Sequence, residues 1–121
     1  MFKIVEIDDA PRAPMENGRG EVVRLVDASI GAEKVDLHMN CLVAGGPNGK
    51  IHRHTHSDNV YIVRKGQGRL IVEGKEYTIR EGQVVYIKAG VRHSLSNVSD
   101  ELFEIFEIYA PAGAAYDFII E

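Results

Sequence analysis

Three histidines at alternate positions are the first feature of the sequence that suggests chemistry. His52, His54 and His56 fall within five residues, whereas the whole chain contains only five histidines. On an extended strand, side chains two residues apart point to the same face, so His52 and His54 can present two imidazoles to one point. Imidazole is the commonest metal ligand among side chains. His56 lies at an expected bend of the chain, and we expect it at a pocket rim or on the surface.

A third ligand would have to come from elsewhere in the chain, and only His38 and His93 remain. His38 alternates with Asp36 and Asn40, a pattern typical of a polar strand face. His93 lies in a segment, residues 82–97, whose glycines indicate tight turns. His93 is therefore the better candidate for the third nitrogen ligand.

The histidine pair lies in a pattern that resembles the first sequence motif of the cupin family, G-x5-H-x-H-x(3 or 4)-E-x6-G. The matching positions are Gly46, His52, His54 and Gly66. Asn59 stands where the family has its glutamate, which is an anionic oxygen donor. Asp58 would fit the shorter family spacing, but its distance to Gly66 is then wrong, so Asn59 ranks above it.

Residues 82–97 resemble the second cupin motif, G-x5-P-x-G-x2-H-x3-N. The matching positions are Gly82, Gly90, His93 and Asn97. Lys88 replaces the family proline. The two motifs occur in order with 15 residues between them, which makes the resemblance specific. Membership in this family implies that both motifs lie close together inside a barrel.

The resemblance also implies one divalent transition metal held by His52, His54 and His93. Iron, zinc, nickel, copper and manganese are the candidate ions. Asn59 offers a neutral amide oxygen that either ligates the ion or hydrogen-bonds a bound water, and we expect a three-histidine site with open positions. Loss of the family carboxylate makes the site more positive by one charge, which favours an anionic small-molecule ligand or substrate. The alternative is a barrel that holds no metal.

Tyr61 is the candidate catalytic residue. It lies two positions beyond Asn59 and shares its face on a regular strand, where it could line the cavity and donate a proton. The competing interpretation is an aromatic side chain packed in the core. Either Phe106 and Ile108, or Ile105 and Tyr109, would supply an apolar wall of the pocket.

Composition limits the class of protein. At 121 residues the chain is expected to form one domain. The net charge is −4 and no basic block occurs, so we expect no nucleic-acid partner. Cys41 is the only cysteine, which excludes an intrachain disulfide. Neither a secretory signal nor a long apolar run is present, so we expect no membrane partner and a cytoplasmic location.

Short alternating segments separated by turn residues recur along the chain, and no segment has a helical period. We expect strands at residues 2–7, 21–26, 34–43, around 52–54, and at 59–63, 69–72, 75–79, 84–87, 92–98, 102–109 and 116–120. The segment at 34–43 alternates cleanly and predicts a half-buried strand. This pattern indicates an all-β sandwich or barrel. The cupin resemblance narrows it to a jelly roll, a double-stranded β-helix of two facing antiparallel sheets.

The N-terminal region is expected to stand apart from the barrel core. Residues 1–20 would contain a strand followed by a loop rich in proline and glycine, and residues 21–121 would form the barrel. Cupins commonly dimerise by exchanging N-terminal strands. We therefore expect a homodimer in which residues 2–7 add to a sheet edge.

Two classes of function follow from the resemblance. One is a metalloenzyme that activates dioxygen or polarises a small carbonyl or hydroxy acid, and an oxidoreductase of the dioxygenase kind is favoured over an isomerase, lyase or decarboxylase. The other is a non-catalytic small-molecule-binding module. The fold does not choose between them.

Overall fold

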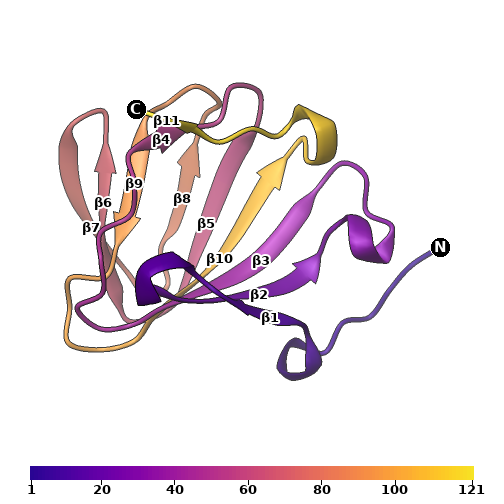
Figure 1. Ribbon diagram of the computed structural model, residues 1–121, viewed down its shortest axis with the longest axis horizontal. Coiled ribbons are helices and arrows are strands. Elements are labelled where there is room, and N and C mark those ends of the chain that lie inside the picture. The colour runs from indigo at the N-terminus through magenta and orange to yellow at the C-terminus, as the bar shows by residue number, and fades with distance from the viewer.

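Two antiparallel sheets make up the protein. The computed structural model describes residues 1–121, and Figure 1 shows the strands wrapping around a common interior. One sheet has six strands in the order β1-β2-β3-β10-β5-β8, and the other has five in the order β11-β4-β9-β6-β7. The all-β jelly-roll prediction is confirmed. No helix is long and apolar enough to cross a membrane.

The strands of the six-stranded sheet are β1 (Arg12–Pro14), β2 (Gly20–Val26), β3 (Asp36–Leu42), β5 (Asp58–Lys65), β8 (Val84–Ile87) and β10 (Phe103–Ala110). Those of the five-stranded sheet are β4 (His52–Arg53), β6 (Gln67–Val72), β7 (Lys75–Arg80), β9 (His93–Ser96) and β11 (Ile119–Ile120). Short 3-10 helices connect some of them: η1 (Ile7–Asp9), η2 (Glu16–Gly18), η3 (Ala28–Ile30) and η4 (Gly113–Ala115). The expected segments thus recur as strands, except at the two ends of the chain.

Alternation places one set of apolar side chains between the sheets. This inner core is made of Leu42, Tyr61, Val63, Leu70, Ile79, Ile87, Leu95, Phe103 and Ile105. The motif glycine Gly66 lies beside it, with φ at +76°, and a side chain there would collide with the Leu102 carbonyl oxygen. Glycine is therefore required at this turn because only glycine combines that backbone conformation with such a close approach.

Strand β3 is buried on both faces, which corrects the expectation of a half-buried strand. Its inner face carries His38 and Leu42, while Met39 and Cys41 form a second, outer cluster with Val23 and neighbouring residues. Ile7 and Ala10 pack against that outer cluster. The N-terminal segment therefore covers the apolar face of β3 on the outside of the barrel, whereas alternation alone assigns that face to the core and the polar face with His38 to solvent.

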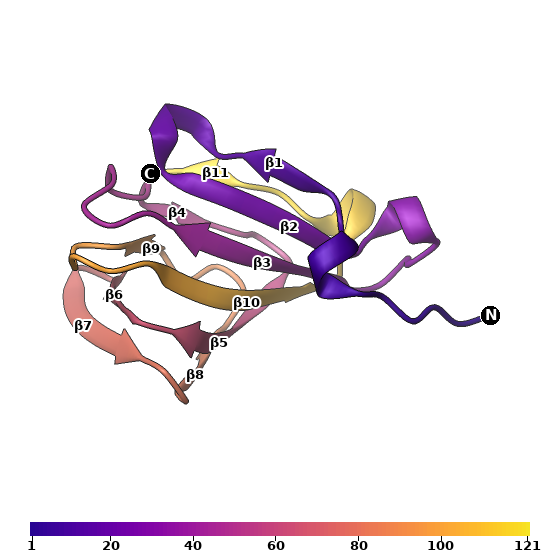
Figure 2. The ribbon, with the colours of Figure 1, turned by 90° about the horizontal axis from the view of Figure 1, so that it is seen from below.

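The prediction of a strand at residues 2–7 is wrong for the chain on its own. Residues 1–6 have no regular structure, and Phe2 and Ile4 are 81% and 87% exposed. Figure 2 shows this end projecting away from both sheets. A strand needs a hydrogen-bonding neighbour, and the free edge of β2 is taken by β1, which arises inside the expected loop.

The expected strand at 116–120 is reduced to Ile119–Ile120, which pairs with β4. The residues before it cross the end of the barrel as an irregular segment. We call Tyr116, Asp117 and Phe118 the C-terminal strap, because they lie against the histidines described next.

Candidate metal centre

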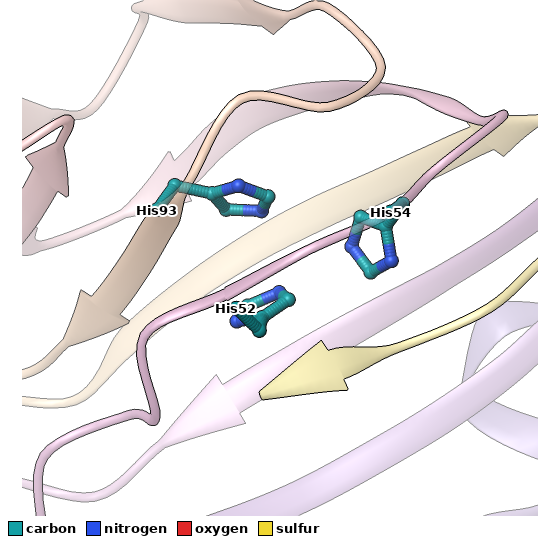
Figure 3. Close-up of side chains that lie close together, drawn as sticks. All are labelled: His52, His54 and His93. Carbon is teal, nitrogen blue, oxygen red and sulfur yellow. The ribbon is translucent and has the colours of Figure 1, made fainter. Parts of the chain in front are cut away.

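The structure brings His52, His54 and His93 together. His52 and His93 are register partners on β4 and β9, and His54 follows the end of β4. One nitrogen from each of the three rings lies within 4.8 Å of the others. Figure 3 shows the three rings converging on one space. The strand pairing thus joins one histidine from each motif, although the two are 41 positions apart in the sequence.

Each of these imidazoles is oriented by its other nitrogen. The Nδ1 atoms of His52, His54 and His93 lie 2.8, 2.6 and 2.9 Å from the backbone carbonyl oxygens of Lys50, Asp117 and Val91. A carbonyl only accepts hydrogen bonds, so Nδ1 carries the proton and Nε2 keeps its lone pair. Metal-ligating histidines are held in this way in proteins generally.

The free nitrogens fit a metal ion. The Nε2 atoms of His54 and His93 are buried and have no hydrogen-bond partner. A buried polar atom without a partner is unfavourable and calls for an explanation. A divalent ion at the usual nitrogen distance of about 2.0–2.1 Å would satisfy both atoms at once.

The electrostatics of the site keep the rings of His52 and His93 neutral. Burial lowers the pKa of His52 to about 4, and burial also lowers the pKa of His93. Neighbouring histidines act in the same direction. Only a neutral imidazole can ligate a metal, so the lowered pKa values favour metal binding by these two rings.

Asn59 lies on β5 in the opposite sheet and is 1% exposed. Its Nδ2 donates a 2.6 Å hydrogen bond to Oε2 of Glu107, whereas its Oδ1 is buried without a partner. The amide oxygen is thereby left available to an ion or to a water bound to it. Both expected roles of Asn59 are compatible with this geometry.

A carboxylate that sequence reasoning missed occupies the cavity wall. Glu107 on β10 accepts hydrogen bonds from Asn59, from Nδ2 of Asn40 at 2.9 Å and from Nε2 of His38 at 2.9 Å. Burial alone would raise the pKa of Glu107, but the hydrogen bond and charge of His38 and the hydrogen bond from Asn40 outweigh it, so the pKa is lowered. The sequence carries a signal for this position, because the alternation that would place Ile105 and Tyr109 on the inner face places residue 107 there as well.

His38 shares a polar strand face with Asp36 and Asn40 as expected, but that face lies inside the barrel and not on the solvent side of a half-buried strand. It is 6% exposed, and its Nδ1 lies 2.8 Å from Oδ1 of Asp36 while its Nε2 contacts Glu107. Burial alone would lower the pKa of His38, but the hydrogen bonds to Asp36 and Glu107 raise it to about 9. His38 is therefore a charged imidazolium between two carboxylates and cannot ligate a metal in this state.

Tyr61 lies next to the centre, both in the core and on the cavity wall. It is 3% exposed and belongs to the inner core, yet it also lines the cavity. Its ring meets that of His93 edge-on, with centroids 6.4 Å apart. Burial raises the pKa of Tyr61 well above its usual value, so its hydroxyl remains a proton donor.

Aromatic side chains of the C-terminal strap close one side of the site. The Phe118 ring stacks on His52 with centroids 4.1 Å apart, and Tyr116 stacks on Tyr109 at 4.0 Å. Of the two alternatives for the apolar wall, the face of Ile105 and Tyr109 is the inner one: Tyr109 lines the cavity and Ile105 lies in the inner core, whereas Phe106 packs against the outer cluster. His56 is exposed and takes no part in the site.

The centre opens into a cavity of about 370 Å³. Its wall includes His52, His54, Tyr61, Glu107, Tyr109, Tyr116, Phe118, Arg19 and Arg24. The cavity is large enough for a small organic molecule and joins the histidines to apolar, acidic and basic side chains.

Comparison with known proteins assigns the family. Residues 39–109 match the family model described as "Cupin domain". This match covers more than half of the chain, and it includes all three histidines of the centre. The chain belongs to the cupin family.

Individual relatives are distant. An uncharacterized protein of Aquifex aeolicus is 34% identical over 61 residues. The aligned region covers 50% of this chain and 50% of that protein. An oxalate-binding protein of Thermotoga maritima is 25% identical over 96 residues, which cover 78% of this chain and 79% of that protein. The structure of the polyketide cyclase RemF from Streptomyces resistomycificus superposes with a TM-score of 0.84 at 18% identity, over 99% of this chain and 85% of that one. At this identity the likeness establishes the fold alone.

Proposed function

We propose that this protein is a metal-dependent cupin acting on a small, anionic molecule. In this proposal His52, His54 and His93 hold one divalent transition ion. The observation that carries it is the arrangement of their nitrogens: each Nδ1 is fixed by a backbone carbonyl, and the free Nε2 atoms converge. An arrangement that leaves two of these atoms buried without partners is unfavourable unless an ion fills it.

The favoured reaction class is an oxidoreductase of the dioxygenase kind. Three neutral ligands leave open positions on an ion, and a bound ion of this type supplies activation of dioxygen or polarisation of a carbonyl. The chain itself would contribute the Tyr61 hydroxyl as a proton donor at the cavity wall. Asn59, held by Glu107, would direct its amide oxygen to the ion or to a bound water.

Two alternatives keep the same centre. A cupin isomerase, lyase or decarboxylase would use the ion to polarise its substrate without dioxygen. A non-catalytic binding module is favoured by one specific observation, the similarity of this chain to the oxalate-binding protein of Thermotoga maritima. The three functions would use the same metal-binding histidines and would differ in whether a product forms and in which product it is.

Dioxygen uptake by the iron(II)-loaded protein separates these alternatives. Small organic acids would be supplied one at a time, and the mixture would be analysed for products. Acid-dependent uptake that disappears in a His93→Ala variant supports the oxidoreductase. Conversion without uptake supports the isomerase, lyase or decarboxylase, and binding without conversion supports the module. A parent protein that retains no metal would contradict all three.

We further propose that the protein forms a cytoplasmic homodimer through its N-terminal segment. Phe2 and Ile4 are apolar and almost fully exposed, so pairing with a partner's sheet edge would bury them. Deleting residues 1–6 should weaken dimerisation and leave the barrel folded, because the segment that packs on the outer cluster begins at Ile7. Light scattering that gives a mass of 13.4 kDa for the intact chain would contradict the dimer.

A further inference from the structure

A positive charge without a counter-charge lines the same cavity as the histidines. Arg19 lies immediately before β2, on the cavity wall that also contains His52 and Tyr61. Its Nη2 donates a 2.9 Å hydrogen bond to the carbonyl oxygen of Leu95, and its Nε is buried with no partner. Burial lowers the pKa of Arg19, which is the signature of a cation held away from water.

No carboxylate forms an ion pair with Arg19. Glu16 attracts Arg19 from a distance, but it is exposed and pairs with Lys50 at 3.1 Å, and Glu21 pairs with Arg12 at 3.1 Å. Glu107 attracts Arg19 without forming an ion pair with it. The carboxylate oxygens of Glu107 instead accept hydrogen bonds from His38, Asn40 and Asn59. A half-buried charge that lacks a partner is unfavourable unless a ligand supplies one.

The guanidinium is also fixed in position. Gly49 lies against it, and a β-carbon at that residue would stand 2.9 Å from Nη2 of Arg19. The same glycine lets the chain approach the carbonyl of Leu95, to which Arg19 is bonded. A guanidinium held in place loses little freedom when a ligand binds, and its planar fork matches a carboxylate.

We propose that Arg19 binds the carboxylate of a small organic acid whose second oxygen group faces His52, His54 and His93. This inference rests on the proposed function, because the second group is placed at the metal. The stacked rings of Tyr109 and Tyr116 supply an apolar wall for the body of the acid between its two polar ends.

Titration of zinc-loaded protein with oxalate, malonate, succinate and glutarate tests this inference. The series separates two carboxylates by increasing lengths, and zinc binds them without redox chemistry. We expect affinity to peak at the member that spans from the ion to Arg19. In Arg19→Gln that member should bind at least about tenfold more weakly, because a charge-assisted hydrogen bond is lost. Oxalate, which can chelate the ion alone, should change much less.

Two further variants control for charge and for folding. Arg80→Gln removes the same charge from an exposed site on β7 and should leave every affinity unchanged. Arg19→Lys keeps the charge and should retain part of the affinity that Arg19→Gln loses. Thermal unfolding and zinc content establish that each variant is folded.

The outcomes separate this inference from the function on which it rests. If the parent binds zinc but Arg19→Gln binds the whole series as the parent does, the inference is wrong and the metal centre stands. The inference is equally wrong if no member of the series binds to zinc-loaded protein. If the parent fails to bind zinc, the proposed function fails, and a loss of carboxylate affinity in Arg19→Gln would still support the anion site.

Discussion

The two sides of the cavity hold histidines of opposite character. On the five-stranded side, His52, His54 and His93 have one nitrogen bonded to a backbone carbonyl and the other free, and burial lowers the pKa of His52 and His93. On the six-stranded side, both nitrogens of His38 contact carboxylates, and its pKa rises to about 9. All four rings share one interior, so the partners of each ring decide its chemistry.

This difference shows how the same type of side chain, an imidazole, can serve either as a metal ligand or as a buried cation. A carbonyl partner fixes the tautomer without adding charge, which leaves a lone pair for a metal. Two carboxylate partners stabilise the imidazolium, which removes that lone pair and ties β3 to β10. We expect the first group to determine metal binding and His38 to determine stability.

Loss of a triad histidine should have the largest effect. Replacing His52, His54 or His93 by alanine should weaken metal binding by at least about a thousandfold, because each supplies a large share of a binding free energy of about 10–16 kcal/mol. The β-sheet circular dichroism should be unchanged. The exposed His56→Ala provides the matched control and should bind metal as the parent does. A triad variant indistinguishable from His56→Ala would show that its histidine is not a ligand.

Replacing His38 should have the opposite consequences. His38→Leu leaves Asp36 and Glu107 buried without their shared cation, which should reduce the free energy of unfolding by about 3–5 kcal/mol. Metal content at saturation should stay close to that of the parent. Urea unfolding and elemental analysis of the same sample measure both quantities. If His38→Leu is as stable as the parent, His38 does not determine stability. If it loses as much metal as His93→Ala, His38 takes part in metal binding, and either result contradicts the contrast drawn between the two sides.

His38 should also give stability a pH dependence of defined sign. A histidine whose pKa rises from 6.5 to about 9 on folding stabilises the protein fully below pH 6.5, and this contribution is lost as the pH rises through about 9. The shift corresponds to at most about 3 kcal/mol. The difference in unfolding free energy between parent and His38→Leu should therefore shrink across this range. A difference that is constant or grows would contradict the assigned charge.

Asn59 donates a hydrogen bond to Glu107 on the six-stranded side and has a free amide oxygen for the metal centre. Its replacement should change stability and metal binding less than the replacements above. Asn59→Glu would set a second carboxylate against Glu107 in place of a hydrogen bond, which should reduce stability by about 2 kcal/mol. Combining it with Glu107→Gln should restore stability and raise metal retention through the added anionic ligand. Asn59→Ala should release little metal if the amide only neighbours the ion.

Metal analysis of these variants decides between the two roles of Asn59. If Asn59→Ala releases as much metal as His93→Ala, the amide oxygen is itself a ligand. If the double replacement remains as unstable as Asn59→Glu alone, repulsion from Glu107 is not the cause of the lost stability.

The sequence predicted the triad better than its surroundings. Motif spacing brought His52, His54 and His93 together because strand parity and the family pattern agree. His38 was misplaced because alternation shows which residues share a face but not which face is inside. Leu42 has the parity of His38 and lies in the inner core, so it carried the missing signal.

The ends of the chain were harder to predict for a different reason. The segment at 2–7 alternates like a strand, yet it pairs with no strand in this chain, and the edge of β2 is taken by β1. The sequence predicts a strand at 116–120, but only Ile119 and Ile120 pair, and Phe118 packs on His52. Such contacts depend on tertiary structure and leave no local pattern in the sequence.

Metal content of the protein purified without a metal-binding affinity tag tests the central claim most directly. The parent should contain about one divalent transition ion per chain, as expected for a single cluster of three nitrogens. The variant in which His52, His54 and His93 are all alanine should contain almost none while keeping its β-fold. Full metal occupancy in that triple variant would contradict the three-histidine centre.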